Sequence, residues 1–304
     1  GEGLRKYPDP AAADLTEAIA KNYGVGTDQV FVGVGSDDVL AMCFLTFFNS
    51  KKPILFPDIT YSFYDVWAGL FQIPFERIPL DDQFKIRPED YKKENGGVIF
   101  PNPNAPTGLA ESRETMEKIV AANPESVVIV DEAYVDFGGE SCRGLIPRYE
   151  NLLVCQTFSK SRSMAGGRLG FALGNAALIA DLEKIKYSTN PYNINRLTLV
   201  AAEAAVDSND YYVKNCRIIA ENREYTVAAL SKLGFETVPS VANFIFTRCS
   251  SIKGDDLYRK LKAKGVLVRH WNKPEIQDYV RVTIGSREQM DIFLDRVREL
   301  LKEE

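Results

Sequence analysis

SVVIVDEAY, residues 126–134, contains four consecutive apolar residues of high β propensity, followed by two carboxylates. A strand that is apolar at consecutive positions must be covered on both faces, unlike the alternating strands of a half-exposed sheet. Such strands belong to parallel sheets that carry helices on both sides. The stretch therefore predicts an α/β fold with a buried central strand that ends in polar residues.

The first 190 residues repeat this alternation between short strands and helices. Strands are predicted at 30–34, 54–56, 75–78, 98–100, 127–130, 152–157 and 169–173. Helices are predicted at 37–48, 61–70 and 111–122, where apolar residues recur with helical spacing. We therefore predict a large domain with a mostly parallel sheet over residues 29–190.

The pattern changes after about residue 190, which predicts a smaller α+β domain. A long helix is predicted at 208–233, strands at 235–238, 244–247 and 280–284, and further helices at 254–264 and 286–302. We assign residues 1–28 and 207–304 to this second domain and 191–206 to a connecting helical segment.

Composition excludes several classes of function. A net charge of −5 without a basic stripe argues against nucleic acid as a partner. The single histidine, His270, excludes a metal site built from several imidazoles, so no metal is expected. No apolar run approaches the roughly 18 residues of a membrane-spanning helix, so no membrane contact is expected.

Cysteine usage bears on the cellular compartment. The five cysteines are odd in number, scattered and without CxxC spacing; they stand at positions 43, 142, 155, 216 and 249. This pattern favours reduced thiols over a disulfide framework. We therefore expect a cytoplasmic protein.

Polar residues follow four of the predicted strands. Ligands of an open α/β sheet bind beyond the carboxyl ends of its strands. The four polar clusters are therefore expected to meet in one site, and they lie at 35–38, 102–108, 131–134 and 159–160.

GVGSDDVL, residues 33–40, joins a strand to a helix. Ser36 and Asp37 open the helix, where free backbone N–H groups bind phosphate well. An ordinary helix cap explains the same residues equally well. The stretch lacks the third glycine of a dinucleotide fingerprint, so both interpretations stay open.

Two further strand ends carry candidate ligands. PNPNAPTG, residues 101–108, is a rigid turn with Asn102 and Asn104, and it is either a plain loop or a binding turn. Asp131 ends an apolar strand, where a carboxylate is costly unless it meets a cation or hydrogen-bond donors. It either caps the next loop or faces a protonated heterocyclic nitrogen, with Tyr134 turned toward the same ligand.

TFSKSRSMAGGRLG, residues 157–170, places Lys160 after a buried strand and Arg168 after two glycines. Lys160 is either a surface lysine or one that loses its proton and bonds covalently to an aldehyde. Tyr61, in PDITYSFY at 57–64, is either a core aromatic or a ring that stacks on a planar cofactor. Together these stretches supply the groups that bind pyridoxal 5'-phosphate (PLP): a lysine, a strand-end aspartate, a phosphate-binding helix start with an arginine, and a stacking ring.

The motifs TFSK…GGRLG, VVIVDEAY, PNPNAPTG and GVGSDD together resemble the class II aminotransferases of PLP fold type I. The resemblance runs from RKYPDP at residue 5 to YVRVTIGS at residue 279. It implies an aspartate aminotransferase-like large domain with a smaller α+β domain. It also implies a homodimer with shared active sites.

The family roles fall on named positions of this chain. The resemblance implies that Lys160 holds PLP covalently and moves a proton from the substrate, that Asp131 pairs with the ring nitrogen, and that Tyr134 binds the ring's O3'. The other implied cofactor contacts are Ser36, Asp37 through its main chain, Tyr61, Asn104, Ser159 and Arg168, with Tyr7 reaching the neighbouring subunit's cofactor.

Within the family, RKYPDP and PSVANFIF, residues 239–246, are similar to enzymes that transfer an amino group from histidinol phosphate to 2-oxoglutarate, giving glutamate, in histidine biosynthesis. Arg281 would bind the carboxylate of glutamate or 2-oxoglutarate through its planar fork. Arg269 would bind the phosphate of the amine substrate. Aromatic amino-acid transamination and threonine-phosphate decarboxylation stay open as alternatives.

Two departures from the family pattern affect these expectations. Where the family usually has asparagine before Pro-Thr-Gly, this chain has Ala105, and Asn104 is the candidate replacement. Loss of that asparagine removes one hydrogen bond, worth about 1 kcal/mol. Family members also carry an N-terminal arm before RKYPDP, whereas this sequence starts almost at the motif, so specificity is harder to infer.

Overall fold

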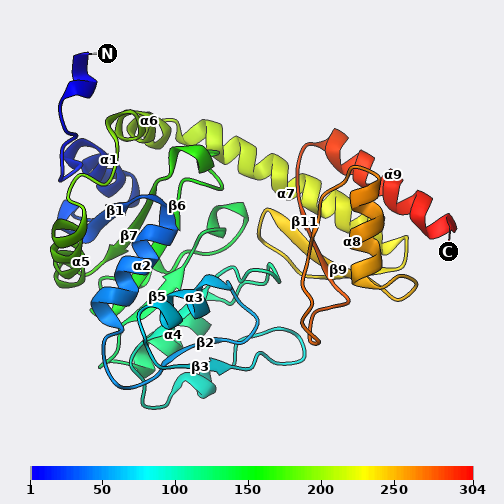
Figure 1. Cartoon of the computed structure of the whole chain (residues 1–304), viewed down its shortest axis with the longest axis horizontal. Coiled ribbons are helices and arrows are strands. Elements are labelled where there is room, and N and C mark those ends of the chain that lie inside the picture. The colour runs from blue at the N-terminus through cyan, green and yellow to red at the C-terminus, as the bar shows by residue number, and fades with distance from the viewer. Residues whose placement is uncertain (1, 304) are drawn as a thin grey trace. The chain divides into compact units, whose positions relative to one another are not determined.

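The computed structural model describes residues 2–303 and separates into two compact units (Figure 1). The first unit runs to Asn102 and also contains Glu111–Ala133 and Glu140–Tyr212. The second unit contains the chain from Val213 onward and two loops, Pro103–Ala110 and Tyr134–Gly139.

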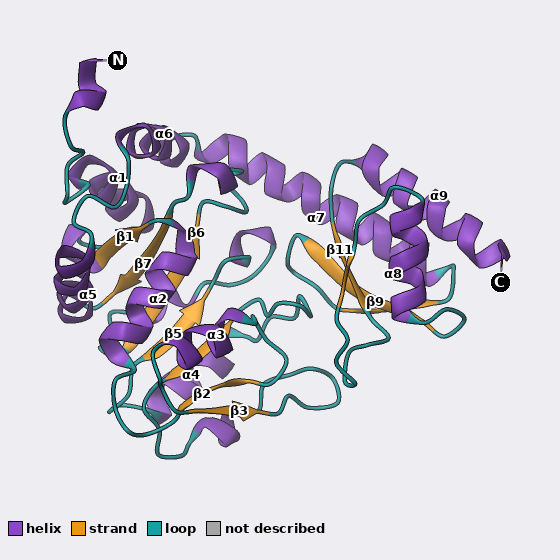
Figure 2. Ribbon diagram, viewed as in Figure 1, coloured by secondary structure: helices purple, strands orange, loops and turns teal. Residues whose placement is uncertain are grey.

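A seven-stranded sheet forms the centre of the first unit (Figure 2). Strand β7 runs antiparallel to β1 and β6, and the other neighbours are parallel. The mostly parallel sheet predicted from the sequence is confirmed. In spatial order the strands are β1 (Val30–Gly33), β7 (Gly170–Gly174), β6 (Leu152–Thr157), β5 (Val128–Asp131), β4 (Val98–Pro101), β2 (Ile54–Pro57) and β3 (Phe75–Ile78).

Two hydrophobic clusters cover the two faces of this sheet. Val128 and Val130 of β5 pack in one cluster, and Ile129 between them packs in the other. Burying each of these side chains stabilises the fold by about 1.5–3 kcal/mol. The first cluster draws on α1 (Ala13–Tyr23), α4 (Arg113–Ala122) and α6 (Arg196–Asp207), and the second on α2 (Gly35–Phe47), α3 (Phe63–Leu70) and α5 (Ala176–Thr189).

The second unit is built on a four-stranded antiparallel sheet. Its order is β10 (Arg269–His270), β11 (Val280–Thr283), β9 (Phe244–Cys249) and β8 (Phe235–Val238). One face packs on α7 (Asn209–Ser231), α8 (Gly254–Ala263) and α9 (Arg287–Glu303). The expected smaller α+β part is therefore present.

The division into units differs from the predicted domain boundaries. Residues 1–28, which we assigned to the smaller domain, include helix α1, which packs on α6 and β1 of the first unit. The cause is the apolar face of α1, because Leu15 and Ile19 are buried in the same cluster as Val30. The predicted connecting segment, 191–206, contains most of α6 and also lies in the first unit.

Candidate active site

The start of helix α2 is closely approached by two other segments of the first unit. Gly35 has a φ of +83°, which glycine adopts without strain. A Cβ on Gly35 would lie 2.5 Å from Nη2 of Arg168, and one on Gly170 would lie 2.3 Å from the backbone nitrogen of Ser36. The lack of a side chain at both positions therefore allows β7 and Arg168 to lie close to the start of the helix. The first amides of a helix lack intrahelical partners and favour an anion.

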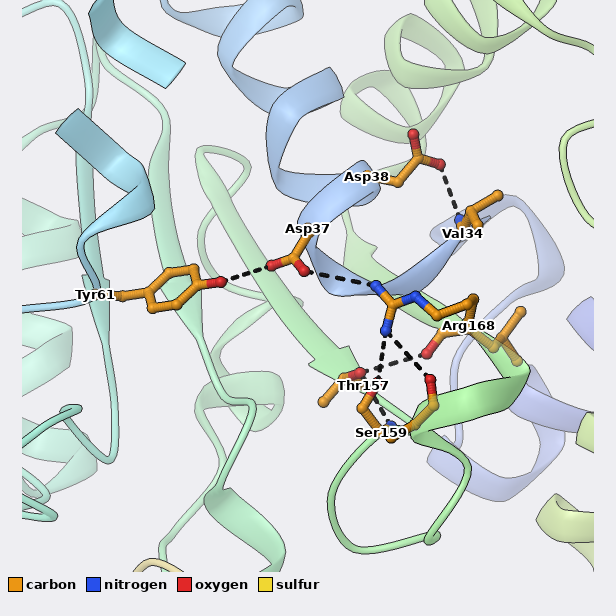
Figure 3. A network of polar contacts seen from close by, with 9 residues as sticks. Val34, Asp37, Asp38, Tyr61, Thr157, Ser159 and Arg168 are labelled. Carbon is orange, nitrogen blue, oxygen red and sulfur yellow. Dashed lines mark hydrogen bonds and ion pairs between the residues drawn. The ribbon is translucent and has the colours of Figure 1, made fainter. Parts of the chain in front are cut away.

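Asp37, in the first turn of α2, joins two of the predicted cofactor ligands (Figure 3). The Tyr61 hydroxyl donates a hydrogen bond of 2.9 Å to Oδ1 of Asp37, and Nη2 of Arg168 lies 3.5 Å from Oδ2. Nη1 of Arg168 also donates to Oγ of Ser159 at 3.4 Å. The structure thus brings together Asp37, Tyr61, Ser159 and Arg168, with Ser36 beside them in the chain.

Lys160 lies in the turn that joins β6 to its antiparallel neighbour β7. The turn is tied together by backbone bonds, among them Ser163 N–H to the Lys160 carbonyl at 3.1 Å. The same turn carries Arg168, so a lysine and an arginine eight residues apart belong to one loop. Lys160 is exposed as a residue.

Arg162, which the sequence reasoning did not single out, anchors this turn. It is buried, and its Nη1 donates to the Ala205 carbonyl at 2.7 Å, near the end of α6. Its guanidinium lies 4.0 Å from the ring centroid of Tyr212 and donates to Oδ1 of Asn209. A cation at a helix C-terminus satisfies a carbonyl and the helix dipole together.

Asp131 ends β5 as a buried carboxylate with 4 % exposure. Burial raises its pKa to about 6, and hydrogen bonds from Tyr64 and the Ala133 N–H, with a smaller effect of the Lys160 charge, partly oppose this rise. Oδ1 accepts a hydrogen bond from the Ala133 N–H at 3.2 Å, and Oδ2 accepts one from the Tyr64 hydroxyl at 3.0 Å. A carboxylate that stays buried at this cost is suited to pairing with a cationic ligand group.

Tyr64 is a second residue that the sequence reasoning missed. It lies three residues after Tyr61, at the start of α3, and in sequence it looked like an ordinary core aromatic. Its side chain is fully buried, and its ring contacts Tyr61 edge-on at 5.8 Å. The only available signal was the spacing of three residues between two tyrosines that follow a predicted strand.

Tyr7 does not join the cluster of its own chain. Its ring stacks on that of Tyr192 at 4.6 Å, and its carbonyl accepts a hydrogen bond from Arg196. The side chain is 77 % exposed. Its expected role toward a neighbouring subunit stays a prediction.

The turn around Asn104 belongs to the second unit. The Asn104 side-chain amide donates to Oγ1 of Thr107 at 3.2 Å, inside the turn itself. Ala105, at the position where the family usually has asparagine, packs in a small apolar cluster with Ala242 and Phe244. The role of Asn104 as a cofactor ligand stays a prediction.

Phe244 brings together two other predicted site residues of the second unit. The Tyr134 ring meets it edge-on at 4.9 Å, and the guanidinium of Arg281 lies 4.9 Å from its centroid. Arg281 stands directly opposite Arg269 on the neighbouring strand. Burial lowers the pKa of Arg281, and Arg269 lowers it further. The second unit thus holds two neighbouring arginines suited to an anion, one of them packed on an aromatic ring.

Residues 2–303 offer neither a metal-ligand cluster nor a membrane-spanning helix. No cluster of three or more histidine, cysteine, aspartate or glutamate side chains there could hold a metal ion. No helix in the same range is long and apolar enough to cross a membrane.

Comparison with known proteins places the chain in a family. Residues 1–297 match the family described as aminotransferase class I and II. Histidinol-phosphate aminotransferase 1 of Hydrogenovibrio crunogenus is 51% identical over 299 residues, which are 98% of this chain and 84% of the relative.

Solved structures show the same fold. The histidinol-phosphate aminotransferase of Clostridium acetobutylicum superposes with a TM-score of 0.92 at 25% identity, covering 100% of this chain and 92% of that one. The histidinol-phosphate aminotransferase of Sinorhizobium meliloti was solved in complex with pyridoxal-5'-phosphate. It superposes with a TM-score of 0.88 at 21% identity, and the match covers 99% of this chain and 85% of that one. The α/β fold expected from the motifs is confirmed, and the chain belongs to the class I and II aminotransferases.

Proposed function

We propose that this chain is a PLP-dependent aminotransferase that moves an amino group from histidinol phosphate to 2-oxoglutarate. The observation that carries the proposal is the 51% identity, over 98% of the chain, to a relative named histidinol-phosphate aminotransferase. At that identity and coverage the pocket residues are expected to be shared along with the fold. The reaction belongs to histidine biosynthesis.

The residues of the first unit fit PLP. The opening of α2, together with Ser159 and Arg168, offers amide, hydroxyl and guanidinium donors for a phosphate, and Gly35 leaves the space that a Cβ would fill. Asp131 offers a buried carboxylate for the protonated ring nitrogen. Lys160 offers an amine for the aldehyde.

Bound PLP supplies an electron sink for the negative charge left when the substrate Cα loses its proton. Lys160 Nζ would hold the cofactor covalently and would serve as the general base that accepts the Cα proton. Asp131 would keep the ring nitrogen protonated, which keeps the sink effective. Tyr61 would orient the ring from one face.

The second unit is proposed to recognise the substrates and one ring oxygen. Tyr134 and Asn104 would donate to O3' of the ring. Arg281 would bind the carboxylate of glutamate or 2-oxoglutarate, and Arg269 the phosphate of histidinol phosphate. Arginine suits both tasks, because its planar fork binds carboxylate and phosphate through paired hydrogen bonds.

We further propose a cytoplasmic homodimer. Large apolar side chains are exposed along α6 and at the start of α7, among them Leu197 at 67 %, Val200 at 63 % and Tyr211 at 68 %. Exposed apolar side chains gathered on neighbouring elements mark association surfaces. Within residues 2–303 none of the five cysteines forms a disulfide, which suits a reducing compartment.

A half-reaction tests the proposal. The protein is loaded with PLP, its absorbance band is recorded, and histidinol phosphate is added without a keto acid. The expected result is loss of the band with formation of pyridoxamine phosphate and a ketone product, because the amino group of histidinol phosphate is carried by a secondary carbon. Addition of 2-oxoglutarate should then restore the band and release glutamate.

Other outcomes identify the alternatives. A band that responds to aromatic amino acids and ignores histidinol phosphate would overturn the donor and keep the aminotransferase. Carbon dioxide release from threonine phosphate would identify a decarboxylase. Absence of any band that depends on Lys160 would overturn the cofactor assignment.

A further inference from the structure

Tyr64 places a single polar atom against the carboxylate of Asp131. The tyrosine lies in the first turn of α3, and its ring is enclosed by Phe44, Phe56 and Trp67. In this apolar surround the hydroxyl donates to Oδ2 of Asp131 at 3.0 Å. Burial, and then the charge of Asp131, raise the pKa of Tyr64, so the hydroxyl keeps its proton and acts as a donor.

Several neighbouring groups change the pKa of Asp131. The Tyr64 hydroxyl and the Ala133 N–H favour its ionised form by hydrogen bonding, and the Lys160 ammonium favours it by charge. The charge of Asp37 opposes ionisation of Asp131. Cys155 stands opposite Asp131 on β6, and the charge of Asp131 adds to the effect of burial in raising the pKa of its thiol. Of the contributions that favour the ionised form, the Tyr64 hydrogen bond is the largest.

We propose that Tyr64 is a positioning residue: its hydroxyl fixes the orientation of the Asp131 carboxylate and keeps it ionised, ready to receive the protonated ring nitrogen of the cofactor. This inference rests on the proposed function, in which Asp131 pairs with that nitrogen.

The Tyr64 ring also supports a second predicted cofactor contact. Its edge-on contact with Tyr61 at 5.8 Å holds the ring that is expected to stack on PLP, while the Tyr61 hydroxyl is bound by Asp37. One side chain thus supports the partner of the ring nitrogen through its hydroxyl and the stacking ring through its apolar body. Tyr64→Phe separates the two, because it removes only the hydroxyl.

The experiment measures the dissociation constant of PLP from the apoprotein between about pH 5 and 8. In the wild type, affinity should fall as pH drops below about 6, because Asp131 is then protonated before the cofactor arrives. Tyr64→Phe should raise the pKa of Asp131 and move this fall upward by about one pH unit, a loss of affinity of about tenfold at pH 6. Contributions from the PLP phosphate and from Lys160 are common to both proteins and cancel in the comparison.

Tyr91→Phe is the matched control. Tyr91 is also fully buried in the first unit, and within residues 2–303 its hydroxyl has no hydrogen-bond partner. Its removal should leave both the affinity for PLP and the pH of the fall unchanged. Equal behaviour of Tyr64→Phe and Tyr91→Phe would overturn the proposal.

A second variant guards against a folding defect of Tyr64→Phe. A fluorinated tyrosine placed at position 64 keeps the shape of the ring and carries a more acidic hydroxyl, which donates a stronger hydrogen bond to the carboxylate. The fall in affinity should then move to lower pH, opposite to the effect of phenylalanine. A merely structural side chain does not produce shifts of opposite sign, and an unmoved fall would overturn the proposal.

Asp131→Asn distinguishes the two levels of inference. In this variant the fall in affinity for PLP at acid pH should vanish. Adding Tyr64→Phe to it should then cause no further shift. If Asp131→Asn removes the fall and Tyr64→Phe leaves it in place, the Tyr64 proposal fails alone. If Asp131→Asn binds PLP like the wild type at every pH, the role assigned to Asp131 fails, and that of Tyr64 with it.

Discussion

Arg269 and Arg281 stand directly opposite each other on the antiparallel strands β10 and β11, and both guanidinium groups lie over the ring of Trp271, at 5.5 and 5.4 Å. Like charges in opposed positions destabilise a sheet. The pair is therefore best stabilised when an anion is bound, which agrees with the substrate-binding roles proposed for both residues.

Neutralising Arg281 should weaken binding of the keto acid. For Arg281→Gln we expect a loss of about 2–5 kcal/mol in apparent binding of 2-oxoglutarate, because a partly buried charged partner is removed. Glutarate, an unreactive dicarboxylate, should raise the Tm of the wild type and have little effect on the variant. Arg248→Gln is the control, since Arg248 on β9 is already paired with Glu236 by contacts of 2.9 and 2.7 Å.

Removal of the Lys160 amine should stop turnover without unfolding the protein. We expect Lys160→Ala to lower kcat by at least about 10³, because the general base is lost with the covalent attachment. The residue is exposed, so the melting temperature should stay near that of the wild type. Steady-state kinetics and thermal unfolding together check this, and near-normal turnover would refute the role of Lys160.

Asp131 should make the apoprotein less stable as pH rises. Its pKa is about 6 in the folded chain against an ordinary value of 3.8, so the folded state binds the extra proton between these values. The contribution of Asp131 to the free energy of unfolding is therefore fully present below about pH 4 and is lost as pH rises through 6. The loss is about 3 kcal/mol for a fully buried group. Urea unfolding of Asp131→Asn should show a more stable apoprotein at pH 7 and no difference at pH 4. A variant that is less stable at pH 7 would contradict this.

Gly170 should tolerate no side chain. A Cβ there would lie 2.3 Å from the Ser36 nitrogen and 2.5 Å from the Gly35 carbonyl carbon, both backbone atoms at the opening of α2. We expect Gly170→Ala to cost about 1–3 kcal/mol in stability and to weaken PLP binding, because the phosphate-binding amides must shift. Gly166→Ala is the control in the turn just before β7, since a Cβ at Gly166 meets no atom within 4 Å. Calorimetry and PLP titration of both variants provide the measurement.

The sequence predicted the sheet well because its signal is local. The apolar run at 127–130 and its counterparts at 98–100 and 152–157 each lie within an observed strand or overlap it by most of their length. Strand β10 was missed, since the two residues Arg269–His270 carry no periodicity and pair only because β11 lies beside them. Helix α2 begins at Gly35, two residues before the predicted start, because the left-handed glycine opens it.

The ligands of the candidate site stay predictions, whereas two buried residues that support them, Tyr64 and Arg162, were missed. Lys160, Asp131 and Arg168 stand at strand ends, a position that sequence patterns reveal. Tyr64 and Arg162 are buried, and their importance depends on which atom each one meets across the fold. The assignment of residues 1–28 to the smaller domain was wrong for a similar reason. The apolar face of helix α1 shows that the helix is packed, but it does not reveal against which domain.

The division of the chain into two units has a consequence for its synthesis. All seven strands of the first sheet, with Asp131, Lys160 and Arg168, precede residue 175 and leave the ribosome first. The loops Pro103–Ala110 and Tyr134–Gly139 pack instead with partners such as Ala242 and Phe244, which are translated about a hundred residues later. Domains emerging from the ribosome fold as units, N-terminal first. The nascent chain is therefore expected to hold a complete sheet with two unanchored loops, and the loop that carries Tyr134 becomes ordered only near the end of translation.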